Sequence, residues 1–326
     1  MGIKARRYAD ILAGAPEYVT GRQDEWKAFL TTAARNYKYP YYDQLMIYLQ
    51  RPEATACAEY DFWFDTMHRY VKRGAKGIAL VDNEGDSPKL RYVFDVADTG
   101  ARSNSRPVWL WQMKEEYQNP VMAALERAYG VSGENLSLEA QLEQVAGRLA
   151  ADYWMNYGRQ ISGIVADSFL EEYDEFNIGA AFRKAAQASI AYTLSVRCTE
   201  EAENQFEPED FRDVADFNTR QTAAALGTAV SSISREVFRE IERAIRDYER
   251  TKAQERSQDY EERNNIQTGR GLSASGDRVE RDDGEAFGQI RENAQSVSEG
   301  EQSDTVQRSG ADGAAVSPSS GDRRDS

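Results

Sequence analysis

The sequence predicts an α+β protein: a small N-terminal α+β domain with a β-hairpin or short sheet, then an all-α domain and a disordered acidic tail. Three observations predict this order. The apolar pattern of the first third changes from a helical period to short apolar runs typical of strands, the middle keeps helical spacing, and the end has no period. Residues 1–115 also hold 18 of the 35 aromatic residues and carry about +2, against −15 for the chain. We therefore expect domains at 1–115 and 116–250, and a tail at 251–326.

Two helices are expected at the start of the first domain. Thr20 and Gln23 have the spacing of a capping box, which marks a helix start. The apolar face that follows consists of Trp26, Phe29, Leu30, Ala33 and Ala34. Pro40 suits the first turn of a second helix, and Pro52 ends it.

Strands are expected next. Residues 77–81 and 90–95 are rich in β-branched and aromatic side chains and flank a polar turn, which predicts a β-hairpin. Residues 107–111, Pro-Val-Trp-Leu-Trp, are a candidate third strand.

The middle region has apolar residues at spacings of three and four over residues 138–153, 178–194 and 226–248, which predicts three helices. Asn218 with Gln221 is a candidate start for the last of these, and Pro208 for a short helix before it. From Thr251 on, apolar residues are isolated, and such a segment buries too little apolar surface to offset its loss of chain entropy.

Composition excludes several classes of function. No apolar run reaches the ~20 residues of a membrane span, and the N-terminus lacks the apolar core of a signal peptide, so we expect a cytoplasmic protein. Two cysteines form neither a disulfide framework nor a four-thiolate zinc site. The single histidine, His68, excludes an HExxH metalloprotease. We therefore expect no metal, no cofactor and no catalytic residues.

Cations gather without acidic residues in one stretch, between Asp65 and Asp82. It contains Arg69, Lys72, Arg73 and Lys76, together with Gly74 and Gly77. The aromatic residues around it are Tyr60, Phe62, Trp63, Phe64 and Tyr70. Cations that neutralise phosphates and rings that stack on bases are what single-stranded nucleic acid requires. By composition alone, the favoured interpretation is a solvated turn beside core aromatics, and Trp63 is expected to be buried.

Five segments in order resemble the N-terminal domain of the ArdC-type antirestriction proteins. They are Trp26 to Leu30, YDQLMIYLQRPEATA (42–56), Trp63, HRYVKRGAKGIALV (68–81) and YVFDVADT (92–99). The resemblance covers about residues 20–112. It implies single-stranded DNA binding, an α+β fold and a role on conjugative plasmids or integrative elements, where such domains also head large helicase and methylase proteins.

The resemblance assigns family positions residue by residue, and with Tyr70 these are the expected DNA contacts: Gln44, Gln50, Arg51, Trp63, Arg69, Lys72, Arg73, Lys76 and Gly77. Three residues depart from the family pattern. Asp43 stands where the family has Asn, which puts a negative charge there, while His68 replaces a Gly and Ala75 a Glu. The HExxH-bearing domain of full-length ArdC proteins has no counterpart, because no histidine follows residue 68.

The sequence thus predicts a non-catalytic single-stranded DNA-binding accessory protein, with a possible protein partner for the helical domain. Two alternatives stay open. One is a protein-interaction scaffold that keeps the fold without binding DNA, which Asp43 favours. The other is the N-terminal part of a longer DNA-processing protein, because the polar end of the chain resembles an interdomain linker. An enzyme is the third-ranked interpretation, and would need a group that the sequence does not reveal.

Overall fold

The computed structural model describes residues 3–82, 87–199 and 205–271 and has the expected α+β fold. Residues Met1–Asp259 form one compact unit, and the chain from Tyr260 on belongs to a second unit. The expected tail beyond residue 271 and the hairpin turn at 83–86 lie outside the described residues.

Three helices open the chain: α1 (Ile3–Thr20), α2 (Gln23–Arg35) and α3 (Tyr41–Gln50). The apolar face expected for α2 is buried, and Pro40 is the residue that caps α3. The expected capping box is wrong, because Thr20 ends a helix that the sequence reading missed. Its hydroxyl donates to the carbonyl of Pro16, four residues back in α1, at 3.1 Å. Arg22 occupies the N-cap position of α2 and makes no side-chain capping bond.

The expected hairpin is confirmed by strands β3 (Ile78–Asp82) and β4 (Lys89–Asp95), which pair antiparallel with Ile78 opposite Val93. The third strand is not at residues 107–111. It is β1 (Cys57–Glu59), which gives the sheet the order β1-β4-β3. Residues 107–111 form no ladder because they cross to the helices, where the Trp111 ring is buried and its Nε1 donates to the Tyr37 hydroxyl at 3.3 Å.

Two further short strands, β2 (Tyr70–Val71) and β5 (Thr99–Gly100), form a separate antiparallel pair. A π-helical turn, η1 (Phe62–Thr66), precedes β2, and a 3-10 turn, η2 (Val96–Asp98), precedes β5. The buried carboxylate of Asp95 accepts hydrogen bonds from the backbone N–H groups of Thr55, Ala56 and Ala97, and thereby joins the chain just before β1 to η2.

The helical region contains α4 (Glu115–Tyr129), α5 (Leu138–Ser162), α6 (Glu175–Cys198), the 3-10 helix η3 (Pro208–Asp216) and α8 (Arg220–Gly271). The predicted helices are confirmed, and Pro208 starts η3 as expected. Asn218 does not cap α8. Thr219 and Thr222 exchange side-chain to backbone hydrogen bonds at its start, while the side-chain oxygen Oδ1 of Asn218 accepts from the backbone N–H of Phe169 at 2.9 Å.

The prediction of disorder from Thr251 is wrong for residues 251–271, which continue α8. Residues 251–261 are almost entirely exposed. Their Lys, Gln, Glu and Arg residues have high intrinsic helix propensity, and extending an existing helix avoids the cost of nucleation. A helix can therefore continue here without an apolar face.

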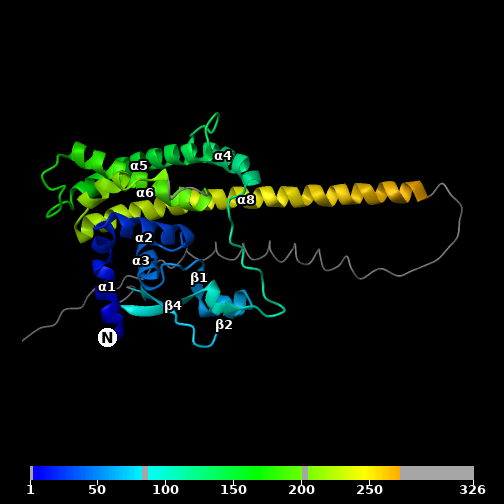
Figure 1. The fold of residues 1–326 in the computed structure, drawn as a ribbon, viewed down its shortest axis with the longest axis horizontal. Helices are drawn as coiled ribbons and strands as arrows, with labels where there is room; N and C mark the ends of the chain where they lie inside the picture. Colours follow the sequence, from blue (N-terminus) through cyan, green and yellow to red (C-terminus); the bar gives the residue numbers. More distant parts are fainter. Residues whose placement is uncertain (1–2, 83–86, 200–204, 272–326) are drawn as a thin grey trace, which may run out of the picture. The chain divides into compact units, whose positions relative to one another are not determined.

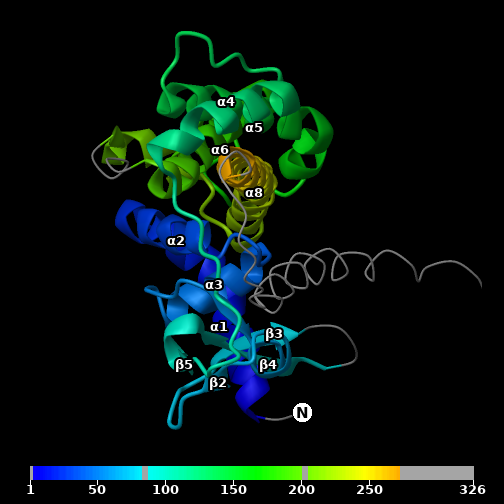
Figure 2. The same cartoon turned by 90° about the vertical axis from the view of Figure 1, so that its right-hand side faces the viewer.

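The N-terminal and helical segments share one core, so the expected boundary at residue 115 does not separate compact units. In both views, α2 and α3 lie between the β-sheet on one side and α5, α6 and α8 on the other (Figure 1, Figure 2). The buried Trp26 of α2 donates through Nε1 to the Ser189 hydroxyl of α6 at 2.9 Å. Tyr37 donates to the Glu242 carboxylate of α8.

Candidate nucleic-acid interface

The cationic turn between β2 and β3 points its charges into solvent. Lys72, Arg73 and Lys76 are exposed, and Gly74 adopts φ +85°, a left-handed conformation that favours glycine. The backbone N–H of Ala75 donates to the Lys72 carbonyl at 3.1 Å and closes the turn. The structure therefore brings three of the expected cations together at the surface.

The turn is anchored on η2 and β5. The backbone N–H of Lys72 donates to the Asp98 carbonyl at 2.8 Å, and its ammonium group donates to the Ala97 carbonyl at 2.9 Å. Arg69 is half-buried, and its Nε donates to the Thr99 hydroxyl at 2.8 Å. Neither contact uses a carboxylate, and neither side chain forms an ion pair within the part of the chain that the structure describes.

Exposed aromatic rings lie beside the turn. Tyr60 and Phe64 stack with ring centroids 6.0 Å apart and planes within 10°. The Arg102 guanidinium lies 5.1 Å from the ring centre of Phe64 and 5.8 Å from that of Tyr70. A Cβ at Gly100 would overlap the Tyr70 ring, so this glycine lets the ring lie flat against β5. Arg102 thus bridges Phe64 of η1 and Tyr70 of β2, and β2 leads directly into the cationic turn.

The Arg102 side chain was not among the residues that the sequence singled out. It follows β5 by two residues, with no motif around it, and reaches Phe64 and Tyr70 only because β2 and β5 pair. We name the surface formed by Tyr60, Phe64, Arg69, Tyr70, Lys72, Arg73, Lys76 and Arg102 the cation–aromatic surface.

Three of the expected contact residues form hydrogen bonds within the fold, although Gln50 stays exposed. Trp63 is 2% exposed, and its Nε1 donates to the Phe94 carbonyl at 2.9 Å, which leaves no ring face for a base. Gln50 bonds the Ala79 backbone in both directions, at 2.8 and 2.9 Å, and so joins α3 to β3. Gln44 is buried, and its amide donates to the Asn36 carbonyl at 3.4 Å.

Two other expected residues also have contacts within the fold. Arg51 forms ion pairs with Asp98 and, through Nε at 3.2 Å, with Glu53. Gly77 faces the Phe94 ring, whose nearest atom would lie 3.1 Å from an added Cβ, so a side chain there would push against β4. Both hold the region together next to the cation–aromatic surface.

Acidic residues near this surface differ in their surroundings. Asp43 is buried in α3 and forms an ion pair with Arg91 of β4. Burial raises the pKa of Asp43, and the Arg91 charge opposes that rise. Asp61 and Asp65 are exposed at and before η1, where they place negative charge beside the Tyr60 and Phe64 rings.

Further chemistry is constrained by what the described residues contain. Among residues 3–82, 87–199 and 205–271, no group of three or more His, Cys, Asp and Glu side chains could hold a metal ion. In the same ranges, none of the helices has the combined length and apolar character needed to cross a bilayer. His68 has φ +51°, and its carbonyl accepts from the Ser105 hydroxyl at 2.7 Å.

Comparison with protein families, with characterised proteins and with solved structures finds no match to this chain.

Proposed function

We propose that this protein binds single-stranded DNA through the cation–aromatic surface and acts without catalysis, as an antirestriction or DNA-transfer accessory protein of a conjugative or integrative element. The proposal takes its biological setting from the resemblance to the ArdC-type N-terminal domain, and a cytoplasmic location from the sequence, which shows no signal peptide and no apolar run of membrane-spanning length. The observation that carries it is that exposed rings and exposed cations occur together. Arg102 lies over Phe64 and Tyr70, and Tyr70 is followed in the chain by the exposed Lys72, Arg73 and Lys76.

Base stacking, charge screening and phosphate contacts all favour binding to an unpaired strand. Stacking of one base on an aromatic side chain contributes about 1–3 kcal/mol and tolerates any base. The acidic charge of the chain, −15, does not prevent this, because charges farther than about 8 Å are largely screened at physiological salt. About four phosphate contacts predict a slope near −3 for log K against log salt, at roughly −0.7 per contact on single strands.

The test is a fluorescence-anisotropy titration of the full chain with single- and double-stranded oligonucleotides over a range of salt. We expect tighter binding to the single strand, and a loss of about tenfold or more when Lys72, Arg73 and Lys76 are replaced by alanine. The matched control removes three exposed arginines from α8, namely Arg239, Arg243 and Arg250. Equal losses in the two triple variants, or binding that ignores salt, would reject the site.

A scaffold is the second candidate, and one observation favours it. Met155, Phe169 and Phe176 are 74%, 67% and 77% exposed where α5 joins α6. Exposed large apolar groups of this kind are frequent where proteins associate. Partners that stay bound after nuclease treatment, and are lost when Phe169 and Phe176 are replaced by serine, would support the scaffold. DNA binding unaffected by the same two changes would assign the two roles to separate surfaces.

A further inference from the structure

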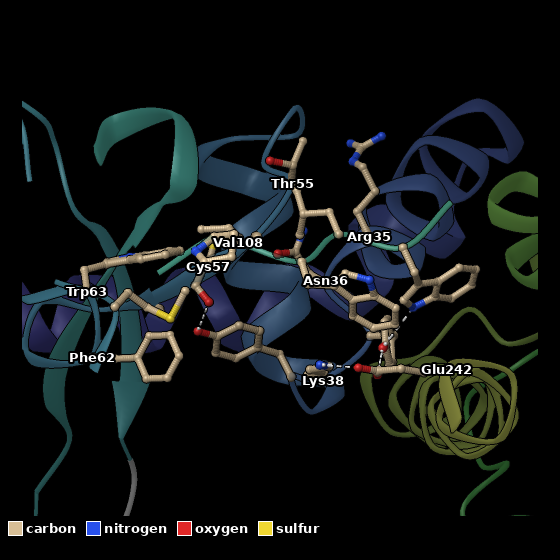
Figure 3. Close-up of a pocket in the computed structure, with 18 of the residues that line it drawn as sticks. Arg35, Asn36, Lys38, Thr55, Cys57, Phe62, Trp63, Val108 and Glu242 are labelled. Carbon is tan, nitrogen blue, oxygen red and sulfur yellow. Dashed lines mark hydrogen bonds and ion pairs between the residues drawn. The ribbon is translucent and has the colours of Figure 1, made fainter. Parts of the chain in front are cut away.

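A cavity of about 500 Å³ lies where the N-terminal segment meets α6 and α8, apart from the residues of the cation–aromatic surface. Its walls come from the end of α2, from β1 and η1, from residues 107–111 and from one face of α8 (Figure 3). Phe62 and Trp63 line one end, and Glu242 lies at the other (Figure 3). Its volume is in the range of sites for small organic ligands.

The lining is cationic in a strongly acidic chain. Four basic side chains face one acidic residue, Glu242: they are Arg35, Lys38, Arg197 and Arg246. Glu242 accepts from the Tyr37 hydroxyl and pairs with Lys38 at 3.1 Å and with Arg246 at 2.8 Å. This single carboxylate is therefore already shared by two cations, and the lining has a net charge of +3 while the chain carries −15.

Arg35 and Arg197 have no ion-pair partner among the described residues. The Nε of Arg35 donates to the Ala54 carbonyl at 3.0 Å, and a terminal nitrogen of Arg197 donates to the Ala34 carbonyl at 3.2 Å. Burial is the largest cause that lowers the pKa of both guanidinium groups. For Arg197, the charge of Arg35 lowers the pKa by a smaller effect, which Tyr37 and Glu242 oppose. Two partly desolvated like charges repel, and an anion bound between them would relieve that repulsion.

Unused hydrogen-bonding groups lie in the same wall. Among the residues that the structure describes, the Nε of Arg197 has no hydrogen-bond partner, and neither has the side-chain oxygen Oδ1 of Asn36, a residue that is only 3% exposed. The Asn36 amide nitrogen already donates to the carbonyls of Thr32 and Ala54. Protein atoms cover both groups, so they mark a wall whose hydrogen bonding is incomplete, and an unpaired buried polar atom normally costs stability.

Aromatic rings complete the lining. The Arg197 guanidinium lies 4.2 Å from the ring centre of Trp111, and that of Arg246 lies 4.6 Å from the ring centre of Trp109. Phe62 and Trp109 remain 45% and 38% exposed, so a planar group can reach them. Flat apolar faces beside cations suit a heteroaromatic base that is attached to an anionic group.

We propose that this cavity binds a nucleoside monophosphate, with its phosphate near Arg35 and Arg197 and its base against the rings of Phe62 and Trp109. The ligand is either a free mononucleotide or one unstacked nucleotide of a bound single strand, and the chemistry of recognition is the same for both. The free-nucleotide form does not depend on the proposed DNA binding.

The experiment titrates the full chain with thymidine monophosphate, excites tryptophan at about 295 nm, and repeats the titration with thymidine and with inorganic phosphate. Trp109 and Trp111 line the cavity and report on it directly. We expect saturable quenching by the monophosphate at concentrations at least tenfold below those needed for either part. No saturation, or phosphate binding as tightly as the nucleotide, would overturn the proposal.

Variants localise the binding. Phe62→Ala changes an exposed ring and should weaken nucleotide binding at least fivefold, as should Arg35→Gln if its circular dichroism stays native. Arg243→Gln, an exposed residue of α8 outside the lining, is the control and should change nothing. Nucleotide binding unchanged in Phe62→Ala rejects the site even if Arg35→Gln unfolds.

The last arm separates this site from the DNA surface. The alanine variant of Lys72, Arg73 and Lys76 should bind the monophosphate like the wild type, whatever its affinity for DNA. An oligothymidylate that displaces the monophosphate identifies a strand nucleotide as the occupant, and one that binds without displacing it identifies a free nucleotide. Loss of nucleotide binding in that triple variant would instead mean that the signal came from the cation–aromatic surface, and would overturn the proposal.

Discussion

Replacing Gly227 by alanine tests whether the N-terminal and helical segments fold as one unit. Gly227 lies in α8, and its Cα faces the ring of Tyr41 at the start of α3. A Cβ at this position would lie closer than 3.0 Å to three atoms of that ring. The ring cannot move aside easily, because Tyr41 is 3% exposed and packs edge-on against Phe29, with centroids 5.7 Å apart.

The expected magnitude follows from two opposing terms. Overpacking of a well-packed core costs about 1–3 kcal/mol, and three ring atoms in conflict place this site near ~3. Alanine in a helix recovers about 1 kcal/mol relative to glycine. The net loss in the free energy of unfolding is therefore about 2 kcal/mol. With a urea dependence of about 3 kcal/mol per molar, the midpoint should fall by roughly 0.7 M.

The assay is urea unfolding followed by tryptophan fluorescence, which includes buried Trp26, and by far-ultraviolet circular dichroism. The two signals should change together and move to lower urea in the variant. Gly14→Ala is the matched control: Gly14 lies in α1 with nothing within 4 Å of an added Cβ. It should gain about 0.5–1 kcal/mol. A midpoint for Gly227→Ala at or above that of the wild type would refute the packing, and separate transitions for the two signals would refute the single unit.

Three further substitutions have effects that particular contacts predict. Burial works to raise the pKa of Glu242, but the Tyr37 hydrogen bond and two cations outweigh it, so its pKa is lowered in the fold. Its stabilising effect is thus present above the ordinary pKa of 4.5 and is lost as the pH falls through the lower folded value. Glu242→Gln should lower the free energy of unfolding in urea by about 1–2 kcal/mol at pH 7, a modest loss because its cationic partners are half-exposed. The loss should be much smaller at pH 3, and a loss that does not depend on pH contradicts this. Asp43→Asn should raise the unfolding free energy at pH 7 by up to about 1 kcal/mol, because burial raises the pKa of Asp43 and Arg91 keeps Glu59 as a partner; a clear loss would show that the ion pair outweighs burial. Tyr70→Ala should weaken single-stranded DNA binding by about 1–3 kcal/mol in anisotropy titrations, while Tyr18→Ala, an exposed ring on α1, should not.

The interior of the N-terminal region shows how far sequence reasoning reached. Spacing alone predicted the buried face of α2 and the β3–β4 hairpin, because periodicity records which side of an element is covered. The exposed cations of the 72–76 turn were also predictable, since glycine is favoured in turns and Lys and Arg side chains are mostly exposed.

The roles of single polar residues could not be read in this way. Gln50 and Trp63 sit in the motif that predicts DNA contact, yet their partners are the Ala79 and Phe94 backbones, thirty residues away in the chain. Arg102 has no motif at all, and the pairing of β2 with β5 brings it to the aromatic rings. Such contacts depend on strand order and register, which no local pattern encodes.

What the sequence by itself determined is the order and type of most elements and the charge of the turn, because these follow from local period and composition. Only the tertiary structure decided that residues 1–259 are one unit and that a cationic, aromatic cavity lies between α2, β1 and α8. The physical reason is that burial is a property of packed faces. Arg35, Arg197 and Glu242 are ordinary charged residues along the chain, and they acquire their shifted pKa values only where those faces meet.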